Sequence, residues 1–297
     1  MNNNNNALQE LREIPSVDEI IDHFKGSMTN APYLFYIQII RKTLDTVRQE
    51  IRQGILSKNI RKTTFLLIGD ALEETSTSSI INVINGTGII LHTGLGRAPL
   101  SKKLINNAMA NVYPYANLEL DIKSGKRGER VLHVRDLLTA ITGSESAVVV
   151  NNNAAAVLIM LNTLAEGKEV IISRGQQVEI GGSFRIPDVI IKSGCKMVEV
   201  GTTNRTHLSD YQDAITKDTG AIMVAHTSNY KVVGFTQTVD LADIGRLADK
   251  KRIPLIVDLG CGAMADFQHL KLPHEPSVLS YVKSAAGVYS FSGDKLL

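Results

Sequence analysis

From residue 146 onwards, the sequence alternates short apolar runs with spacers of helical length, and no other feature constrains the fold as strongly. The runs are rich in β-branched residues and occupy 146–150, 169–173, 196–200, 221–226, 254–260 and 287–293. Near-continuous apolar runs are typical of strands that are buried on both faces. Spacers of helical length allow crossover connections between parallel strands. The pattern therefore predicts an α/β fold with a mostly parallel sheet covered by helices.

The beginning of the chain has a different pattern, which predicts helices. Ser16 and Glu19 have the spacing of a capping box, which indicates a helix start. A second helix is expected over residues 32–51, and the polar run at 74–79 is typical of a linker. We therefore divide the chain into a disordered tip (1–6), a helical amino-terminal region (7–79) and a sheet-bearing domain (80–297).

The bulk composition excludes several classes of protein. A net charge of +2 over 297 residues gives no global field that would attract nucleic acid or an anionic membrane. Cys195 and Cys261 stand far apart and outside any CxxC or His/Cys cluster, so neither a disulfide framework nor a zinc site is expected. No apolar run approaches the roughly 18 residues that span a bilayer. We therefore expect a cytoplasmic protein without a metal site or membrane contact.

One local stretch is markedly basic. Residues 41–62 hold seven Lys or Arg against two acidic residues, a local balance of +5. Charge runs on helices are usually solvated faces. The alternative is contact with the phosphate backbone of a nucleic acid, and the residues alone leave both interpretations open.

The first predicted strand leads into a candidate phosphate site. Asn152, Asn153 and Ala154 follow the run at 146–150 and open an apolar helix. A helix start offers backbone N–H groups and a positive dipole end to an anion, although an ordinary N-cap has the same residues. Neither a dinucleotide G-x-G-x-x-G after a strand nor a G-x-x-x-x-G-K-[ST] loop is present, so NAD and ATP lose support.

An acid and a lysine follow later strand ends. Asp258 lies at the end of an apolar run with glycines behind it, and Lys295 follows Ser292 in a Ser-Gly-Asp-Lys turn. Ligands of such sheets bind beyond the carboxyl ends of the strands. A phosphate cradle, a buried acid and a lysine are together what pyridoxal phosphate requires: an anchor, a partner for the ring nitrogen and a Schiff-base amine. A turn-capping acid and a surface lysine remain the alternatives.

Seven ordered motifs and the opening segment resemble one enzyme family. The opening is LREIPSVDEII, and the motifs are INGTGIILHTGLGRAPLS, YANLELDIKSGKRGER, VVVNNNAAAVLIMLNTLA, EVIISRGQQVEIGGSFRIPDVIIKSG, VEVGTTNRTHLSDYQDAI, HTSNYKVVGFT and FSGDKLL. They resemble those of bacterial L-seryl-tRNA(Sec) selenium transferases, or selenocysteine synthases, over essentially the whole chain. The resemblance implies the large domain of a fold-type I pyridoxal-phosphate-dependent transferase, with a small helical amino-terminal region and no carboxyl-terminal domain.

The resemblance also implies a reaction. Family members convert serine that is esterified to selenocysteine tRNA into selenocysteine, using selenophosphate and passing through an aminoacrylyl intermediate. On the matching positions, Lys295 would hold the cofactor and then take the Cα proton of the substrate. Asp258 would pair with the pyridinium nitrogen.

The other cofactor contacts follow from the same resemblance. Asn152, Asn153 and Ala154 would cradle the cofactor phosphate, and Ser292 would add a further donor. His226 would contact the ring or its 3′-oxygen, unless it is a satisfied core histidine.

Three arginines and the basic stretch complete the implied site. Arg97, in HTGLGR, would bind the oxyanion of selenophosphate through two parallel donors, unless it forms a surface ion pair. Arg127 and Arg130 would play a similar part, reaching the site of a neighbouring subunit in a homo-oligomer. The helical amino-terminal region would bind seryl-charged tRNA, which favours the phosphate-contact interpretation of residues 41–62.

Two departures from the family pattern stand out. Gly94 occupies a place where Asn is common, and the chain stops at Leu297, whereas family members continue with another strand, further arginines and a small domain. A strand missing from within a sheet leaves unpaired backbone groups, at about 1–3 kcal/mol for each one buried. We therefore expect an incomplete, inactive chain. The alternatives are a related lyase or transferase that uses pyridoxal phosphate on a free small amino acid, and a non-catalytic remnant.

Overall fold

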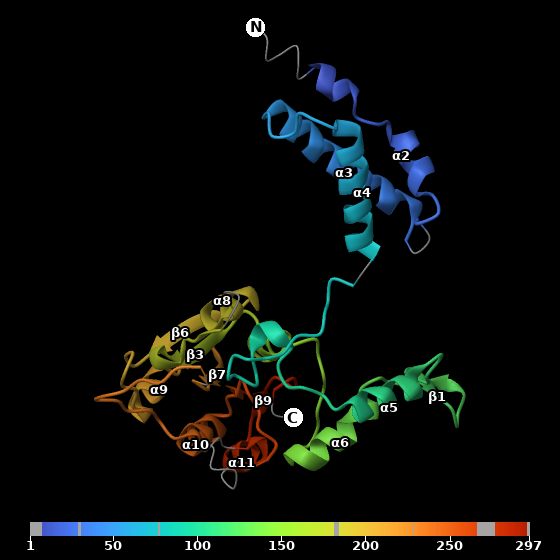
Figure 1. Cartoon of the computed structure of the whole chain (residues 1–297). Helices are drawn as coiled ribbons and strands as arrows, with labels where there is room; N and C mark the ends of the chain where they lie inside the picture. The colour runs from blue at the N-terminus through green and yellow to red at the C-terminus, as the bar shows by residue number, and fades with distance from the viewer. Residues whose placement is uncertain are drawn as a thin grey trace. The chain divides into compact units, whose positions relative to one another are not determined.

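The computed structural model describes residues 8–28, 31–76, 78–180, 184–227, 229–265 and 277–295. The chain divides into two compact units, Met1–Ile84 and Asn85–Leu297, and each is considered by itself (Figure 1). Within the described ranges, no helix is both long and apolar enough to cross a membrane. The predicted disordered tip at 1–6 lies outside the described residues.

The first unit is helical, as its sequence pattern predicts. Its described helices include α2 (Val17–Phe24), α3 (Tyr33–Arg52) and α4 (Ile60–Ser76). The Ser16 hydroxyl caps α2 by accepting from the Glu19 N–H at 3.2 Å. Helix α4 continues through Ser76, into the polar run that the sequence predicts to be a linker from residue 74. Polar composition alone does not show at which residue a helix ends. The buried core of the unit comprises Ile20, Tyr36, Ile40, Leu44, Ile68 and Leu72, with a second cluster of Val47, Ile51 and Ile60.

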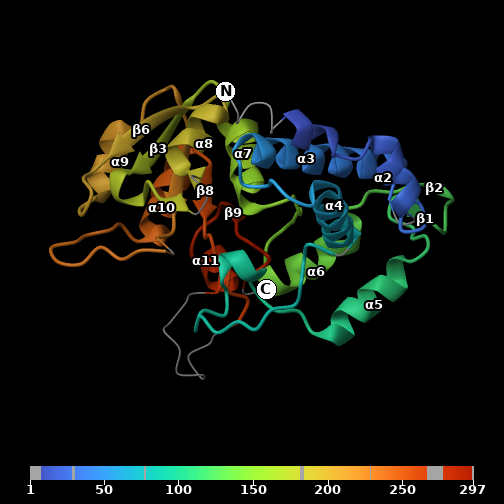
Figure 2. The same cartoon turned by 45° about the horizontal axis from the view of Figure 1, so that its top comes forward.

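A five-stranded parallel sheet forms the centre of the second unit (Figure 2). In spatial order its strands are β6 (Lys196–Val200), β3 (Glu169–Ser173), β7 (Thr219–Ala225), β8 (Leu255–Asp258) and β9 (Val288–Ser290). These strands confirm five of the six predicted apolar runs. Their register aligns Ala225 with Asp258, and Asp258 with Ser290. The last residues of three neighbouring strands therefore lie in one row.

Helices cover both faces of the sheet, as the continuous apolar runs require. Alternate residues of β3 show the two faces, because Val170 and Ile172 join one buried cluster and Ile171 joins the other. The first face is covered by α7 (Asn153–Ala165) and α8 (Ile186–Lys192). The second is covered by α9 (Leu208–Ala214), α10 (Leu241–Lys251) and α11 (Val278–Ser284).

The predicted strand at 146–150 is wrong. These residues form no strand, and the side chains of Val148 and Val149 are 69% and 63% exposed. A strand needs a hydrogen-bonding neighbour, and within the described ranges none pairs with this run. Apolar β-branched composition indicates a segment suited to a sheet, but it does not supply the partner.

Residues 93–142 contain helices and a hairpin that lie outside the central sheet. They form the short helix η1 (Thr93–Leu95), α5 (Lys102–Val112), the antiparallel pair β1 (Leu120–Asp121) and β2 (Lys126–Arg127), and α6 (Leu132–Thr142). Two further short strands, β4 (Glu179–Ile180) and β5 (Phe184–Arg185), follow the short helix η2 (Arg174–Gln176). Contact with α11 connects α6 to the helices of the sheet.

Candidate functional site at the strand ends

The carboxyl ends of β7, β8 and β9 are joined by backbone hydrogen bonds. The His226 N–H donates to the carbonyl oxygen of Asp258 at 2.8 Å, and the Leu259 N–H donates to that of Ser290 at 2.9 Å. The sheet register therefore continues into the segments after the strands. The three segments that carry His226, Asp258 and Lys295 therefore leave the sheet at the same edge.

Asp258 is the buried acid of this edge, only 2% exposed. Its Oδ1 accepts hydrogen bonds from Asn153 Nδ2 at 2.7 Å, Gly260 N at 3.0 Å and Ser290 Oγ at 3.4 Å. Burial raises the pKa of Asp258 above its ordinary value, against these hydrogen bonds and the charge of Lys295, which lower it. Desolvation is the larger effect, so a further cationic donor would stabilise the charged carboxylate.

Lys295 and Asp258 share a neighbour in Gly260. The Lys295 amine donates to the carbonyl oxygen of Gly260 at 3.0 Å, and the same carbonyl accepts from the Ser292 N–H at 3.2 Å. Gly260 has a left-handed backbone with φ +66°, a conformation that glycine adopts without steric cost. The lysine is therefore half-buried and tied to the loop behind the acid.

A second glycine fixes the distance between the two strand-end segments. Gly262 has φ +68°, and a Cβ at this position would lie 2.4–2.5 Å from the side chain of Phe291. No side chain fits there without displacing the ring. The loop after β8 and the segment after β9 therefore pack directly against each other.

The start of α7 lies beside this edge. Asn152 caps the helix, and its Oδ1 accepts from the Ala155 N–H at 2.9 Å, which confirms the predicted cap. The first N–H groups of a helix have no partner within it, and here they belong to Asn153 and Ala154. The hydrogen bond from the Asn153 side chain to Asp258 was not foreseen from sequence.

Arg97 forms an ion pair with Asp294, the residue before the lysine. Arg97 Nε lies 3.0 Å from Asp294 Oδ2, with the arginine side chain 27% exposed, and the Ala98 N–H donates to the Asp294 carbonyl at 3.2 Å. Arg97 has a positive φ of 61°, rare for a residue with a side chain. Sequence reasoning missed Asp294, although its place next to the lysine was a usable signal.

His226, Arg127 and Arg130 lie in other surroundings. The His226 ring meets the Tyr281 ring edge-on, with centroids 6.2 Å apart. Both Arg127 and Arg130 pair with Glu119, at 2.7 Å and 2.5 Å. The structure thus groups Arg127 of β2 and Arg130, which follows that strand, around one carboxylate.

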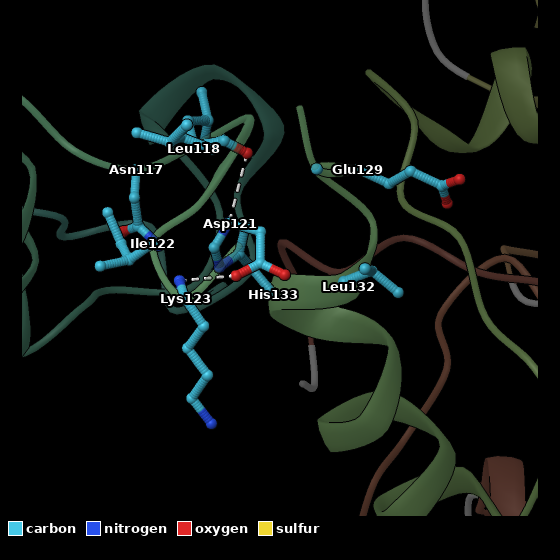
Figure 3. A pocket seen from close by; sticks show the side chains of 10 residues that line it. Asn117, Leu118, Asp121, Ile122, Lys123, Glu129, Leu132 and His133 are labelled. Carbon is cyan, nitrogen blue, oxygen red and sulfur yellow. Dashed lines mark hydrogen bonds between the residues drawn. The ribbon is translucent and has the colours of Figure 1, made fainter. Parts of the chain in front are cut away.

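A hollow of about 330 Å³ lies at the hairpin and the start of α6 (Figure 3). In it, the Lys123 N–H donates to Asp121 Oδ1 at 2.8 Å, and His133 Nε2 lies 3.2 Å from the Leu118 carbonyl oxygen. All its lining residues come from 117–133, so the strand-end residues form a separate site. Among the described residues, no group of three or more His, Cys, Asp or Glu side chains is arranged to hold a metal.

Comparison with known proteins places the chain in one family. The model of the L-seryl-tRNA selenium transferase family matches residues 83–297. This chain is 45% identical to the L-seryl-tRNA(Sec) selenium transferase of Clostridium botulinum strain Okra and 46% identical to that of Alkaliphilus metalliredigens, in each case over 97% of its length. The chain spans 63% of the length of these relatives.

A solved structure shares the fold. D-glucosaminate-6-phosphate ammonia-lyase superposes with a TM-score of 0.53 at 19% identity, over 68% of this chain and 52% of that one. This likeness agrees with the predicted α/β fold.

Pyridoxal phosphate, the cofactor expected from the resemblance, is the cofactor of this family, and the strand-end residues fit it. The fit rests on a buried carboxylate whose pKa is raised by burial, a lysine amine bound to the carbonyl of Gly260 in the loop after that acid, and a helix start whose Asn153 is hydrogen-bonded to the acid. The orphaned Oδ1 of Asn153, buried and without a hydrogen-bond partner, marks the same place as built for a polar ligand. By the match of its residues 83–297 to the family model, the chain belongs to the L-seryl-tRNA selenium transferase family.

Proposed function

We propose that this chain supplies the cofactor-binding part of an enzyme that converts seryl-tRNA(Sec) into selenocysteinyl-tRNA(Sec), with selenophosphate as the selenium donor. One observation carries the proposal: the buried carboxylate of Asp258 and the amine of Lys295 are both hydrogen-bonded to Gly260, beside the start of α7. An acid, an amine and a helix start at one strand edge match the three anchoring points of pyridoxal phosphate.

Each anchor has a distinct task in this proposal. The N–H groups at the start of α7, from Asn152 to Ala154, bind the phosphate, because a helix start favours an anion. Asp258 takes the ring nitrogen and keeps it protonated. Ser292 adds a donor from the segment after β9. Bound in this way, pyridoxal phosphate supplies an electron sink for the substrate.

Lys295 has two tasks. Its amine holds the cofactor aldehyde until substrate arrives, and afterwards removes the proton from the substrate Cα. Its hydrogen bond to the Gly260 carbonyl directs Nζ toward the loop behind Asp258. His226, whose backbone joins β7 to Asp258, contributes from the neighbouring strand end.

Arg97 is the proposed anion-binding residue. Its guanidinium already binds one carboxylate, that of Asp294, at 3.0 Å, and a guanidinium fits phosphate oxyanions in the same two-donor geometry. Selenophosphate would compete with Asp294 for it, directly beside Lys295. Arg127 and Arg130 are proposed to serve a neighbouring subunit's site in a homo-oligomer, where the substrate anion would replace Glu119.

The amino-terminal unit is proposed to bind the tRNA. Two of its seven basic residues between 41 and 62 are ion-paired, Arg48 with Asp45 and Arg61 with Glu19. The others, Arg41, Lys42, Arg52, Lys58 and Lys62, form no ion pair within the described residues. Such free cations release counterions on meeting a phosphate backbone. The cytoplasmic location that the cysteine pattern suggests stays a prediction.

Three measurements on the 1–297 chain test the proposal. Added pyridoxal phosphate should give the visible absorbance of a lysine-bound cofactor, lost in Lys295→Ala. Selenocysteine tRNA should bind more tightly than serine tRNA in a gel-shift assay. The expectation that the chain alone is inactive stays a prediction, which turnover of seryl-tRNA with selenophosphate would overturn. A lysine variant that keeps the absorbance would disprove the cofactor site, and equal binding of the two tRNAs would favour a free amino acid as substrate.

A further inference from the structure

Asn153 and Asp258 are joined by a side-chain hydrogen bond across 105 positions of sequence. Asn153 Nδ2 donates to Asp258 Oδ1 at 2.7 Å, the shortest of the three hydrogen bonds to that oxygen. Asn153 is the first residue of α7, and Asp258 is the last residue of β8. The bond therefore connects the proposed phosphate anchor to the proposed ring-nitrogen anchor.

The two oxygens of the Asp258 carboxylate are treated differently. Oδ1 accepts from Asn153, Gly260 and Ser290. No described residue donates to Oδ2. Within the described residues, the hydrogen bonds to the carboxylate thus all reach Oδ1. The lone pairs of Oδ2 remain for a hydrogen-bond donor that belongs to a ligand.

The orientation of the Asn153 amide follows from this arrangement. An ionised carboxylate only accepts hydrogen bonds, so the amide must turn its NH₂ group toward Asp258. Its own carbonyl oxygen, Oδ1, is then buried without a partner. Leaving a buried acceptor unpaired is unfavourable. Nothing else within the described residues holds the amide in this orientation, so the hydrogen bond to Asp258 does.

We propose that Asn153 is the positioning residue for Asp258, with a side chain that turns the carboxylate so that Oδ2 meets the ring nitrogen of pyridoxal phosphate. This inference rests on the proposed function. It separates the roles of two neighbours: Asn152 caps the helix through its side chain, whereas Asn153 acts through its side chain on the acid. A shift at the helix start is thereby transmitted to the ring-nitrogen anchor.

A double-mutant cycle in the cofactor-free chain tests the hydrogen bond itself. Asn153→Ala should raise the unfolding equilibrium constant about tenfold when Asp258 is present, and far less in an Asp258→Ala background. The matched control is Asn162→Ala, an asparagine of the same helix whose Nδ2 donates to the Ser193 carbonyl at 3.1 Å. Its effect should add to that of Asp258→Ala within about twofold.

A pH series distinguishes positioning of the acid from a general packing role. The hydrogen bond favours the ionised carboxylate, so the cost of Asn153→Ala should shrink as Asp258 becomes protonated at low pH. Lys295, the other charged group whose field reaches Asp258, is unchanged in this comparison. The cost of Asn162→Ala should not change with pH. Equal pH profiles for the two variants would overturn the inference.

Cofactor titration separates this inference from the proposed function. Asn153→Ala should weaken binding of pyridoxal phosphate about tenfold, and Asn162→Ala less than about twofold. If neither Asp258→Ala nor Lys295→Ala changes the binding of pyridoxal phosphate, the proposed function fails. If those two lose binding while Asn153→Ala matches Asn162→Ala in all three measurements, only the role of Asn153 fails. Should Asn153→Ala not fold, Asn153→Ser, which is too short to reach Asp258, takes its place throughout.

Discussion

The carboxylate of Asp258 and the amine of Lys295 are held by the two polar groups of one residue. The Gly260 N–H donates to Asp258 Oδ1 at 3.0 Å, and the Gly260 carbonyl accepts from Lys295 Nζ at 3.0 Å. One glycine therefore contacts both groups on which the proposed chemistry depends, and a change in its backbone conformation would disturb both hydrogen bonds.

Gly260→Ala should damage the site more than the fold. A side chain in the left-handed region costs about 1–2 kcal/mol, and relaxation of that strain would shift both hydrogen bonds. We expect this loss in the free energy of unfolding together with weaker binding of pyridoxal phosphate. Gly54→Ala is the control, because Gly54 has φ +73° and open space around it, in the other unit. Equal cofactor affinity in the two variants would contradict this role of Gly260.

Asp258 should make the stability of the cofactor-free chain depend on pH. Burial raises the pKa of Asp258 in the folded protein, so the folded state binds this proton more tightly than the unfolded state. Above the folded-state pKa, the charged Asp258 therefore lowers the free energy of unfolding. As the pH falls from the folded-state pKa to the unfolded-state pKa, the folded protein takes up the proton and the free energy of unfolding rises. Asp258→Asn should remove this dependence and stabilise the chain at neutral pH, as measured by urea denaturation.

The control for that measurement is Asp249→Asn, at an exposed position of α10. It should leave the pH profile as it is in the parent chain. If the free energy of unfolding of Asp258→Asn depends on pH in the same way as that of the parent chain, burial does not raise the pKa of Asp258 as predicted.

Gly262→Ala should destabilise the second unit through one contact. The new Cβ would overlap the Phe291 side chain and sit on a left-handed backbone. Overpacking of this kind costs about 1–3 kcal/mol, and the backbone strain adds about 1–2 kcal/mol. Phe291→Ala in the same chain removes the ring atoms that the new Cβ would meet but keeps the Phe291 Cβ. It should therefore recover only the part of the overpacking that comes from the ring, so the double variant should lose less than the sum of the two single variants. Strict additivity in thermal denaturation would rule out the predicted overlap.

The free cations of the amino-terminal unit should contribute to the salt dependence of tRNA binding. Replacing Arg52 and Lys58 with Gln should lower the magnitude of the slope of log K against log salt by roughly one per lost phosphate contact. Lys250 and Lys251, exposed at the end of α10, provide a matched pair of Gln substitutions in the other unit. A slope that responds equally to both pairs would indicate a nonspecific charge effect.

The architecture was predictable where local pattern decides it. The apolar runs became five of the expected strands, and Asn152 caps α7 as its position indicates. Residues 146–150 show the limit, since their composition suits a strand but strand formation depends on a neighbour. The local sequence indicates the conformation that a segment favours, whereas strand pairing depends on whether another strand lies beside it.

The site was predictable in its residue types and less so in its connections. Asp258 and Lys295 could be found because strand ends meet at one edge of a parallel sheet. The Asn153 hydrogen bond could not, because it joins residues 105 positions apart whose approach depends on how α7 packs. The ion pair between Arg97 and Asp294 also joins distant segments; the place of Asp294 beside Lys295 indicated the acid, but not its partner.

The position of β9 has a consequence for Lys295. Within the described chain, this three-residue strand lies at the rim of the sheet and is bonded to β8 alone. Lys295 thus follows the strand pair of this sheet with the fewest aligned residues, where local opening breaks the fewest hydrogen bonds. Local opening of the β8–β9 pair would release the amine from Gly260 while the other strand pairs stay closed.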